Sequence, residues 1–170
     1  KIFLDLKIHD IPNTMADAAE SMVGLGVDMF NVHASSGLNA MKTLMQRLQS
    51  VKNPPIVLAV TALTSFSNNS FEPIYHASIA QKVIEFATDA YASGLQGVVC
   101  SVYESLSIKQ HTSNTFLTLT PGIRPFNEAK NDQERVADLE DAKMQCSDFI
   151  VVGRPIYGSS DPLGVVKKII

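Results

Sequence analysis

The stretch KIFLDLKIHD, residues 1–10, has the pattern of a β-strand that carries charged residues among aliphatic ones. Successive side chains of a strand point to opposite faces, so Phe3, Asp5 and Lys7 share one face. The other face is aliphatic and consists of Ile2, Leu4, Leu6 and Ile8. We expect the aliphatic face to pack against covering helices. Asp5 and Lys7 then lie close together on the inner face, with Asp10 just beyond the strand.

Expected strands and helices alternate along the rest of the chain. Runs rich in Val, Ile and Leu predict six strands, over 1–8, 27–34, 54–65, 96–102, 115–123 and 148–156. Apolar residues at helical spacing predict helices over 12–26, 38–51, 77–94, 104–111, 134–145 and 161–170, and a polar stretch, FSNNSFEP (66–73), precedes the third. Such βα units are typical of a parallel sheet that is buried on both faces.

Polar residues favour one parallel architecture, the TIM (β/α)8 barrel, because they gather where strands end and such barrels carry their chemistry there. These residues are Asp5, Lys7, Asp10, His33, Thr64, Ser101, Arg124 and Arg154. No GxGxxG follows the first strand and no GxxxxGK[ST] occurs, which disfavours the nucleotide-binding doubly wound folds. Six units in 170 residues average about 28 each, so eight need roughly 225. We therefore expect residues 1–170 to form one incomplete barrel domain of about six βα units, with the first two strands absent.

Composition and charge disfavour several classes of protein. The net charge is -3 and no basic stripe occurs, so we expect no binding to nucleic acid or acidic membranes. No apolar run approaches the length of a membrane span and no charged-then-apolar leader pattern occurs, so we expect neither a membrane span nor a signal peptide. Cys100 and Cys146 lack the spacing of metal ligands and have apolar neighbours, so we expect both to be reduced core residues of a cytoplasmic protein.

The charged residues of the opening stretch allow two interpretations. Asp5 and Lys7 are either a structural ion pair at the polar end of the barrel or part of an active site. Asp10 adds a second acid, and the negative potential of two acids keeps a lysine charged and ready to donate a proton.

A family resemblance adds to this pattern. FLDLKIHDIPNT (3–14) resembles the signature of the orotidine 5'-monophosphate decarboxylases. Its DxKxxD core also occurs in relatives that act on sugar phosphates, and the IPNT that follows narrows the match. Further segments resemble the family in order: NVHA (31–34), VTALTS (60–65), GVVCSV (97–102), TPGIRP (120–125), NDQERV (131–136) and VVGRPI (151–156). The resemblance runs the whole length of the chain.

The resemblance implies a cofactor-free and metal-free decarboxylation of orotidine 5'-monophosphate to uridine 5'-monophosphate in de novo pyrimidine synthesis. It implies that Lys7 protonates pyrimidine C6 after CO2 departs and that Asp5 faces the substrate carboxylate. It also implies a homodimer in which Asp10, Ile11 and Thr14 reach the partner's site.

For the rest of the substrate, the resemblance implies a contact from Thr64 and a lid segment that contains Gln133. Phosphate binding has independent support, because barrels often bind phosphate with the loops after their last two strands, where TPGIRP and VVGRPI fall. Gly153 allows backbone amides to approach an anion. Arg124 and Arg154 carry planar guanidinium groups that can bind two phosphate oxygens at once.

One departure from the family pattern and two alternatives stay open. The family usually continues after NDQERV with Ser or Thr and then Pro, whereas this chain has ADLEDA (137–142), which leaves the start of the next helix undecided. A magnesium-dependent sugar-phosphate decarboxylase or aldolase would need a further carboxylate, for which Glu104 is the nearby candidate. A non-catalytic phosphate-binding barrel would be expected to lose Lys7 or Asp5, and both are present.

Overall fold

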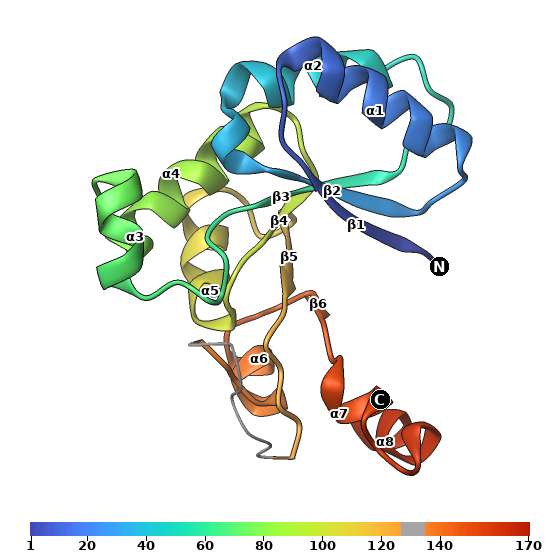
Figure 1. The fold of residues 1–170 in the computed structure, drawn as a ribbon, viewed down its shortest axis with the longest axis vertical. Helices are drawn as coiled ribbons and strands as arrows, with labels where there is room; N and C mark the ends of the chain where they lie inside the picture. Colours follow the sequence, from blue (N-terminus) through green and yellow to red (C-terminus); the bar gives the residue numbers. More distant parts are fainter. Residues whose placement is uncertain (127–134) are drawn as a thin grey trace.

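The computed structural model describes residues 1–126 and 135–170, and its centre is one parallel sheet of six strands (Figure 1). The strands are β1 (Phe3–Ile8), β2 (Met29–His33), β3 (Ile56–Val60), β4 (Gly97–Val99), β5 (Leu117–Thr120) and β6 (Phe149–Ile150). Each pairs with the next in parallel, in the order β1-β2-β3-β4-β5-β6. All six expected strands are therefore present and form a half-barrel, with β1 and β6 as its edges in the described part of the chain.

Helices connect successive strands, as parallel pairing requires. They are α1 (Pro12–Gly24), α2 (Leu38–Leu48), α3 (Asn68–Tyr75), α4 (Ile79–Ala92), α5 (Val102–His111), α6 (Leu139–Met144), α7 (Arg154–Tyr157) and α8 (Pro162–Ile169), with a short 3-10 helix over Ala34–Ser36. Figure 1 shows α1 and α2 packed side by side near β1 and β2, and α7 and α8 together beyond β6. No helix in the described ranges is long and apolar enough to cross a membrane.

Helix α3 was not expected, because the polar stretch FSNNSFEP has no periodic apolar stripe. Ser67 and Ser70 form a reciprocal capping box at its start, which satisfies backbone amides that a helix leaves unpaired. Phe71 is fully buried and stacks on Tyr75 with ring centroids 4.3 Å apart. The buried Phe71 therefore packs α3 against the hydrophobic core, and the capping box stabilises its first turn.

Helix α6 begins later than expected, at Leu139, and Glu134 lies outside the described residues. Asp138 caps the helix, because its carboxylate accepts a hydrogen bond from the Asp141 amide at 2.8 Å. The Asp141 carboxylate in turn accepts one from the Asp138 amide at 3.3 Å. This capping box provides the helix start that the missing Ser/Thr–Pro pair left undecided.

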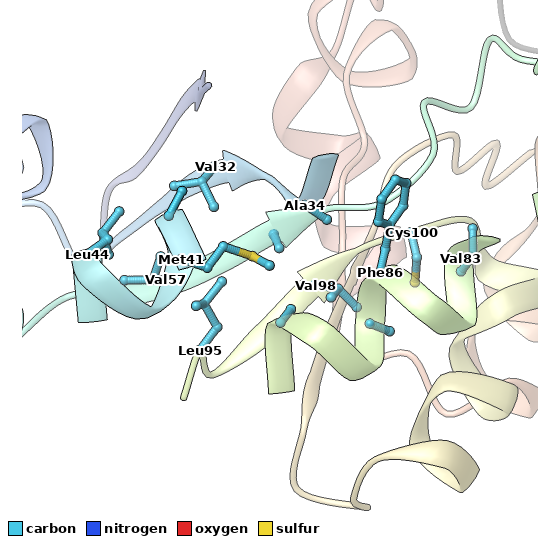
Figure 2. Close-up of a cluster of buried hydrophobic side chains, with 14 of the residues drawn as sticks. Val32, Ala34, Met41, Leu44, Val57, Val83, Phe86, Leu95, Val98 and Cys100 are labelled. Carbon is cyan, nitrogen blue, oxygen red and sulfur yellow. The ribbon is translucent and has the colours of Figure 1, made fainter. Parts of the chain in front are cut away.

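The main core lies between the sheet and its helices (Figure 2). Figure 2 shows side chains from β2, β3 and β4 that meet side chains from α2 and α4, and those labelled include Val32, Met41, Leu44, Val57, Phe86 and Val98. A second, smaller cluster contains Met29, Leu58 and Leu119, with Phe3 and Val99 packed against it. Met29 alternates with the core residues Phe30 and Val32 along β2, so this cluster lies on the opposite, inner face of the sheet.

Strand β1 departs from regular pairing. Leu4 pairs with Phe30 and Ile8 with Val32, so β1 advances by four residues while β2 advances by two. Leu4 and Ile8 pack against the main core as expected. Leu6 lies inside the irregular segment and is 52% exposed, so the prediction that helices cover it is wrong. The bulge turns this residue away from the sheet face that simple alternation assigns to it.

Two other burial predictions are wrong. Ile2 precedes β1 and is 58% exposed, rather than covered. Cys146 is exposed, because it follows the C-cap of α6 in a left-handed turn with φ 56°. Cys100, at the end of β4, is buried and reduced as predicted.

Candidate active site

The bulge in β1 places Lys7 beside Asp5. Lys7 has φ 54°, a left-handed conformation that is uncommon for residues other than glycine. Its ammonium donates a hydrogen bond to Oδ1 of Asp5, with Nζ and Oδ1 2.6 Å apart. The expected proximity of the two charges is therefore confirmed. It depends on the bulge as well as on alternation, because bulges re-aim side chains next to active sites.

Asn31, in the middle of β2, holds both charged residues of β1. Its Oδ1 accepts a hydrogen bond from the Lys7 amide at 2.7 Å, and its Nδ2 donates to Oδ1 of Asp5 at 2.6 Å. The residue is 1% exposed. Asn31 was noted from the sequence only as part of NVHA, and its contacts were not predicted. The available signal was one amide between the apolar residues Phe30 and Val32 of β2.

These contacts determine the charge of Asp5. Burial raises the pKa of its carboxyl, but the hydrogen bonds from Lys7 and Asn31 and the charge of Lys7 together hold the pKa below the usual 3.8. Asp5 is therefore ionised at neutral pH. Half of its side chain is exposed, so the pair opens toward solvent.

His33, at the end of β2, is a neutral neighbour of this pair. Partial burial lowers the pKa of its imidazole, electrostatic interactions with His9 and Lys7 lower it further, and the negative charge of Asp5 offsets part of this. The His9 and His33 rings are tilted to each other with centroids 5.6 Å apart. Lys7 is therefore the cation beside Asp5 at neutral pH, and His33 adds no competing charge.

A cavity of about 490 Å³ opens at this end of the sheet, which is large enough for a small-molecule ligand. Its polar wall contains Asp5, Lys7, Asn31 and Thr64. The other lining residues are Phe3, Val60, Ala62, Leu63, Ser65, Val99, Cys100, Leu119, Pro121 and Val151. The structure thus brings together three of the sequence-predicted site residues, Asp5, Lys7 and Thr64, at the carboxyl ends of the strands.

Three predicted residues lie outside this cavity, at the junction of β1 and α1. Asp10 is exposed, and its carboxylate accepts a hydrogen bond from the Ile11 amide at 2.7 Å. Ile11 is 67% exposed, and Thr14 is exposed in the first turn of α1. None of the three lines the cavity of its own chain.

The predicted phosphate residues Arg124, Gly153 and Arg154 follow β5 and β6 at the border of the cavity, but they do not line it. Arg124 is 6% exposed and its guanidinium donates to the Ile123 carbonyl at 3.0 Å. Gly153 precedes α7, whose first residue is Arg154. Pro121 and Val151, from the same two loops, do line the cavity. Gln133 lies outside the described residues.

Arg135 links helix α5 to the segment after β3 that lines the cavity, and its role was not predicted from the sequence. Its guanidinium forms an ion pair with Glu104 and donates to the carbonyls of Ala62 and Leu63, each at 3.1 Å. Its amide donates to the Thr64 carbonyl at 3.3 Å. Local sequence gives no signal for contacts that span 72 positions.

The carboxylate of Glu104 takes part in the same set of contacts as Arg135. Besides Arg135, it accepts a hydrogen bond from the Ser101 amide at 2.8 Å, and burial raises the pKa of its carboxyl. In residues 1–126 and 135–170, no group of three or more His, Cys, Asp or Glu side chains is placed to hold a metal ion. The Glu104 carboxylate is already paired with Arg135 and Ser101.

Comparison with known proteins identifies the family. Residues 1–169 match the model of the orotidine 5'-phosphate decarboxylase / HUMPS family. The chain belongs to this family. It is similar to the orotidine 5'-phosphate decarboxylase of a Nitratiruptor species, with 62% identity over 99% of this chain and 74% of the relative. It is also similar to the enzyme of that name from Sulfurimonas denitrificans, with 63% identity over the whole chain and 75% of the relative.

Solved structures agree with the family assignment. The crystal structure of orotidine 5'-phosphate decarboxylase from Lactobacillus acidophilus superposes with a TM-score of 0.84 at 38% identity, over 99% of this chain and 73% of that one. The expected fold class, about six βα units of a (β/α)8 barrel, is confirmed. The chain spans about three quarters of the length of these decarboxylases.

Proposed function

We propose that this chain is an orotidine 5'-phosphate decarboxylase whose reaction takes place in the cavity beside β1. The substrate is orotidine 5'-monophosphate and the products are uridine 5'-monophosphate, a pyrimidine nucleotide, and CO2. The observation that carries the proposal is the Asp5–Lys7 pair, 2.6 Å apart on the cavity wall, in a chain that is 62% identical to a named decarboxylase.

In the proposed mechanism, the substrate carboxylate lies against the ionised Asp5 and C6 lies near the Lys7 ammonium. When the bond between C6 and the carboxylate breaks, CO2 leaves and its bonding electron pair stays on C6. Lys7 transfers a proton to that pair and takes a proton back from solvent. Repulsion between the two carboxylates is relieved as CO2 departs, and the preorganised ammonium stabilises the developing negative charge. These steps use side chains alone, without a cofactor or metal.

We also propose that the phosphate and ribose end of the substrate contacts Thr64, Arg124, Gln133, Gly153 and Arg154. The borders of the cavity support this proposal, since the two arginine-bearing loops contribute Pro121 and Val151 to its wall. Contacts remote from C6 provide binding energy that holds the reacting carbon near Lys7.

A homodimer is the third part of the proposal, with Asp10, Ile11 and Thr14 of one protomer completing the site of the other. All three are exposed at one junction, and Ile11 presents an apolar side chain there. We expect the dimer to be cytoplasmic, with no nucleic-acid or membrane partner.

The function is tested by adding orotidine 5'-monophosphate to the purified full-length protein and following the loss of orotate absorbance with a chelator present. We expect decay that the chelator does not change. A well-folded dimer that leaves the absorbance unchanged, but acts on sugar phosphates when magnesium is supplied, would contradict the proposal and favour the magnesium-dependent alternative.

A further inference from the structure

The geometry points to Asn31 as a positioning residue for the decarboxylation. We infer that its amide group holds the Lys7 backbone in its left-handed conformation and, at the same time, orients the Asp5 carboxylate. This inference rests on the proposed function of Lys7 as the proton donor. It adds the residue that positions that donor.

The first step concerns the backbone. A lysine at φ 54° needs support from its surroundings, because an L-residue meets steric conflict in that region. The β1–β2 pairing is interrupted there, since the register shifts between Leu4 and Ile8. The Lys7 amide hydrogen bonds instead to Oδ1 of Asn31 at 2.7 Å. The side chain of Asn31 thus replaces a ladder hydrogen bond at the residue whose conformation is unusual.

The second step concerns the carboxylate. Oδ1 of Asp5 accepts from both Nδ2 of Asn31 and Nζ of Lys7, each at 2.6 Å. Two donors on one oxygen restrict the orientation of the carboxylate. Asn31 is 1% exposed, so water does not readily replace either of its bonds. One buried amide therefore sets the positions of both reacting charges.

A purely structural role would make Asn31 one more buried amide whose loss lowers stability alone. The contacts of Asn31 favour a positioning role instead, because its two hydrogen bonds are made to Lys7 and Asp5, the charged residues that line the cavity. The matched comparison is Ser105, a fully buried polar side chain that bonds Thr118 at 2.7 Å and does not line the cavity.

The experiment compares Asn31→Ala, Asn31→Asp and the control Ser105→Ala in the full-length protein. Asn31→Ala loses both bonds. Asn31→Asp keeps the acceptor for the Lys7 amide but places a second carboxylate oxygen against Asp5. We expect kcat to fall about 10²-fold in Asn31→Ala with KM changed less than about threefold, because misplacement of reacting groups acts on the chemical step. Ser105→Ala should lose thermal stability while kcat stays within about twofold of wild type.

Two spectroscopic readouts separate this inference from the proposed function. The Lys7 amide should lose protection from hydrogen exchange in Asn31→Ala and keep it in Asn31→Asp. The pKa of Asp5, followed by NMR, should rise in both variants and more in Asn31→Asp, where a like charge faces it. Wild-type kcat in both Asn31 variants, with unchanged Lys7 exchange and Asp5 titration, would overturn the inference. An inactive wild type would contradict the proposed function, and the two NMR readouts would still decide the role of Asn31. If Asn31→Ala does not fold, the isosteric Asn31→Asp still tests the orientation of Asp5, because a wild-type kcat with an unchanged Asp5 titration in that variant would overturn the inference.

Discussion

Replacement of Asp5 by asparagine separates the two interpretations of the charged pair. The side chains of Asp5 and Lys7 are 51% and 38% exposed, with Nζ and Oδ1 2.6 Å apart. At that distance two unit charges attract by about 1.6 kcal/mol in water, and side-chain entropy and salt offset most of it. Exposed pairs of this kind contribute roughly 0–1 kcal/mol to stability. We therefore expect Asp5→Asn to change the free energy of unfolding by no more than about 1 kcal/mol.

Activity should respond far more strongly to Asp5→Asn. The asparagine has the same shape and keeps an oxygen for Lys7 and Asn31, but it carries no charge against the substrate carboxylate. Removing one preorganised electrostatic group from an active site typically costs about 10²–10³ in rate, so we expect kcat/KM to fall at least about 10²-fold. Urea denaturation measures the stability, and loss of orotate absorbance measures the rate.

Glu85→Gln provides the control for Asp5→Asn. It removes another partly exposed ion pair, Lys82–Glu85 at 2.7 Å on α4, which lies outside the cavity. Its stability change should be similarly small and its activity unchanged. If Asp5→Asn instead unfolds readily while the folded fraction keeps wild-type kcat/KM, the pair is structural and the reasoning is refuted.

Three further predictions concern the surroundings of the site. Glu104→Gln leaves the guanidinium of Arg135 without its carboxylate in a largely buried place, so urea denaturation should show a loss of roughly 3 kcal/mol; unchanged stability would contradict this. The imidazole of His33 has a folded-state pKa below its usual 6.5, so the unfolded chain binds the extra proton first and stability should fall as pH drops below 6.5. His33→Gln should flatten that part of the melting temperature profile, and an unaltered slope would show that another group is responsible. Phe71→Ala empties a fully buried site and should cost about 3–5 kcal/mol, with loss of α3 helicity in circular dichroism, whereas a variant as stable as wild type would exclude Phe71 as the anchor.

Much of the fold follows from local pattern. The apolar run of β3 is buried on both faces, which is why its sequence alone identifies it as a strand of a parallel sheet. The two-residue period of a strand places Asp5 and Lys7 on one face, although their contact also depends on the bulge in β1. The late start of α6 could also have been read, because Asp138 and Asp141 have the spacing of a capping box.

The features that escaped prediction depend on tertiary contacts. The left-handed position in β1 could not be predicted from a glycine, because Lys7 occupies it. Its amide donates a hydrogen bond to the side chain of Asn31 on the neighbouring strand, which local sequence does not indicate. Helix α3 depends on the buried side chain of Phe71, rather than on apolar residues repeated at helical spacing. Arg135 reaches carbonyls more than 70 positions earlier in the chain, a pairing that no local spacing encodes.

The central claim is that Lys7, placed by the bulge in β1, delivers the proton to C6. The most direct test is Lys7→Ala in the full-length protein, measured for both uridine 5'-monophosphate binding and orotidine 5'-monophosphate decarboxylation in the presence of a chelator. We expect the variant still to bind the product nucleotide, while the rate of loss of orotate absorbance falls to background. Decarboxylation by Lys7→Ala at the wild-type rate would contradict it.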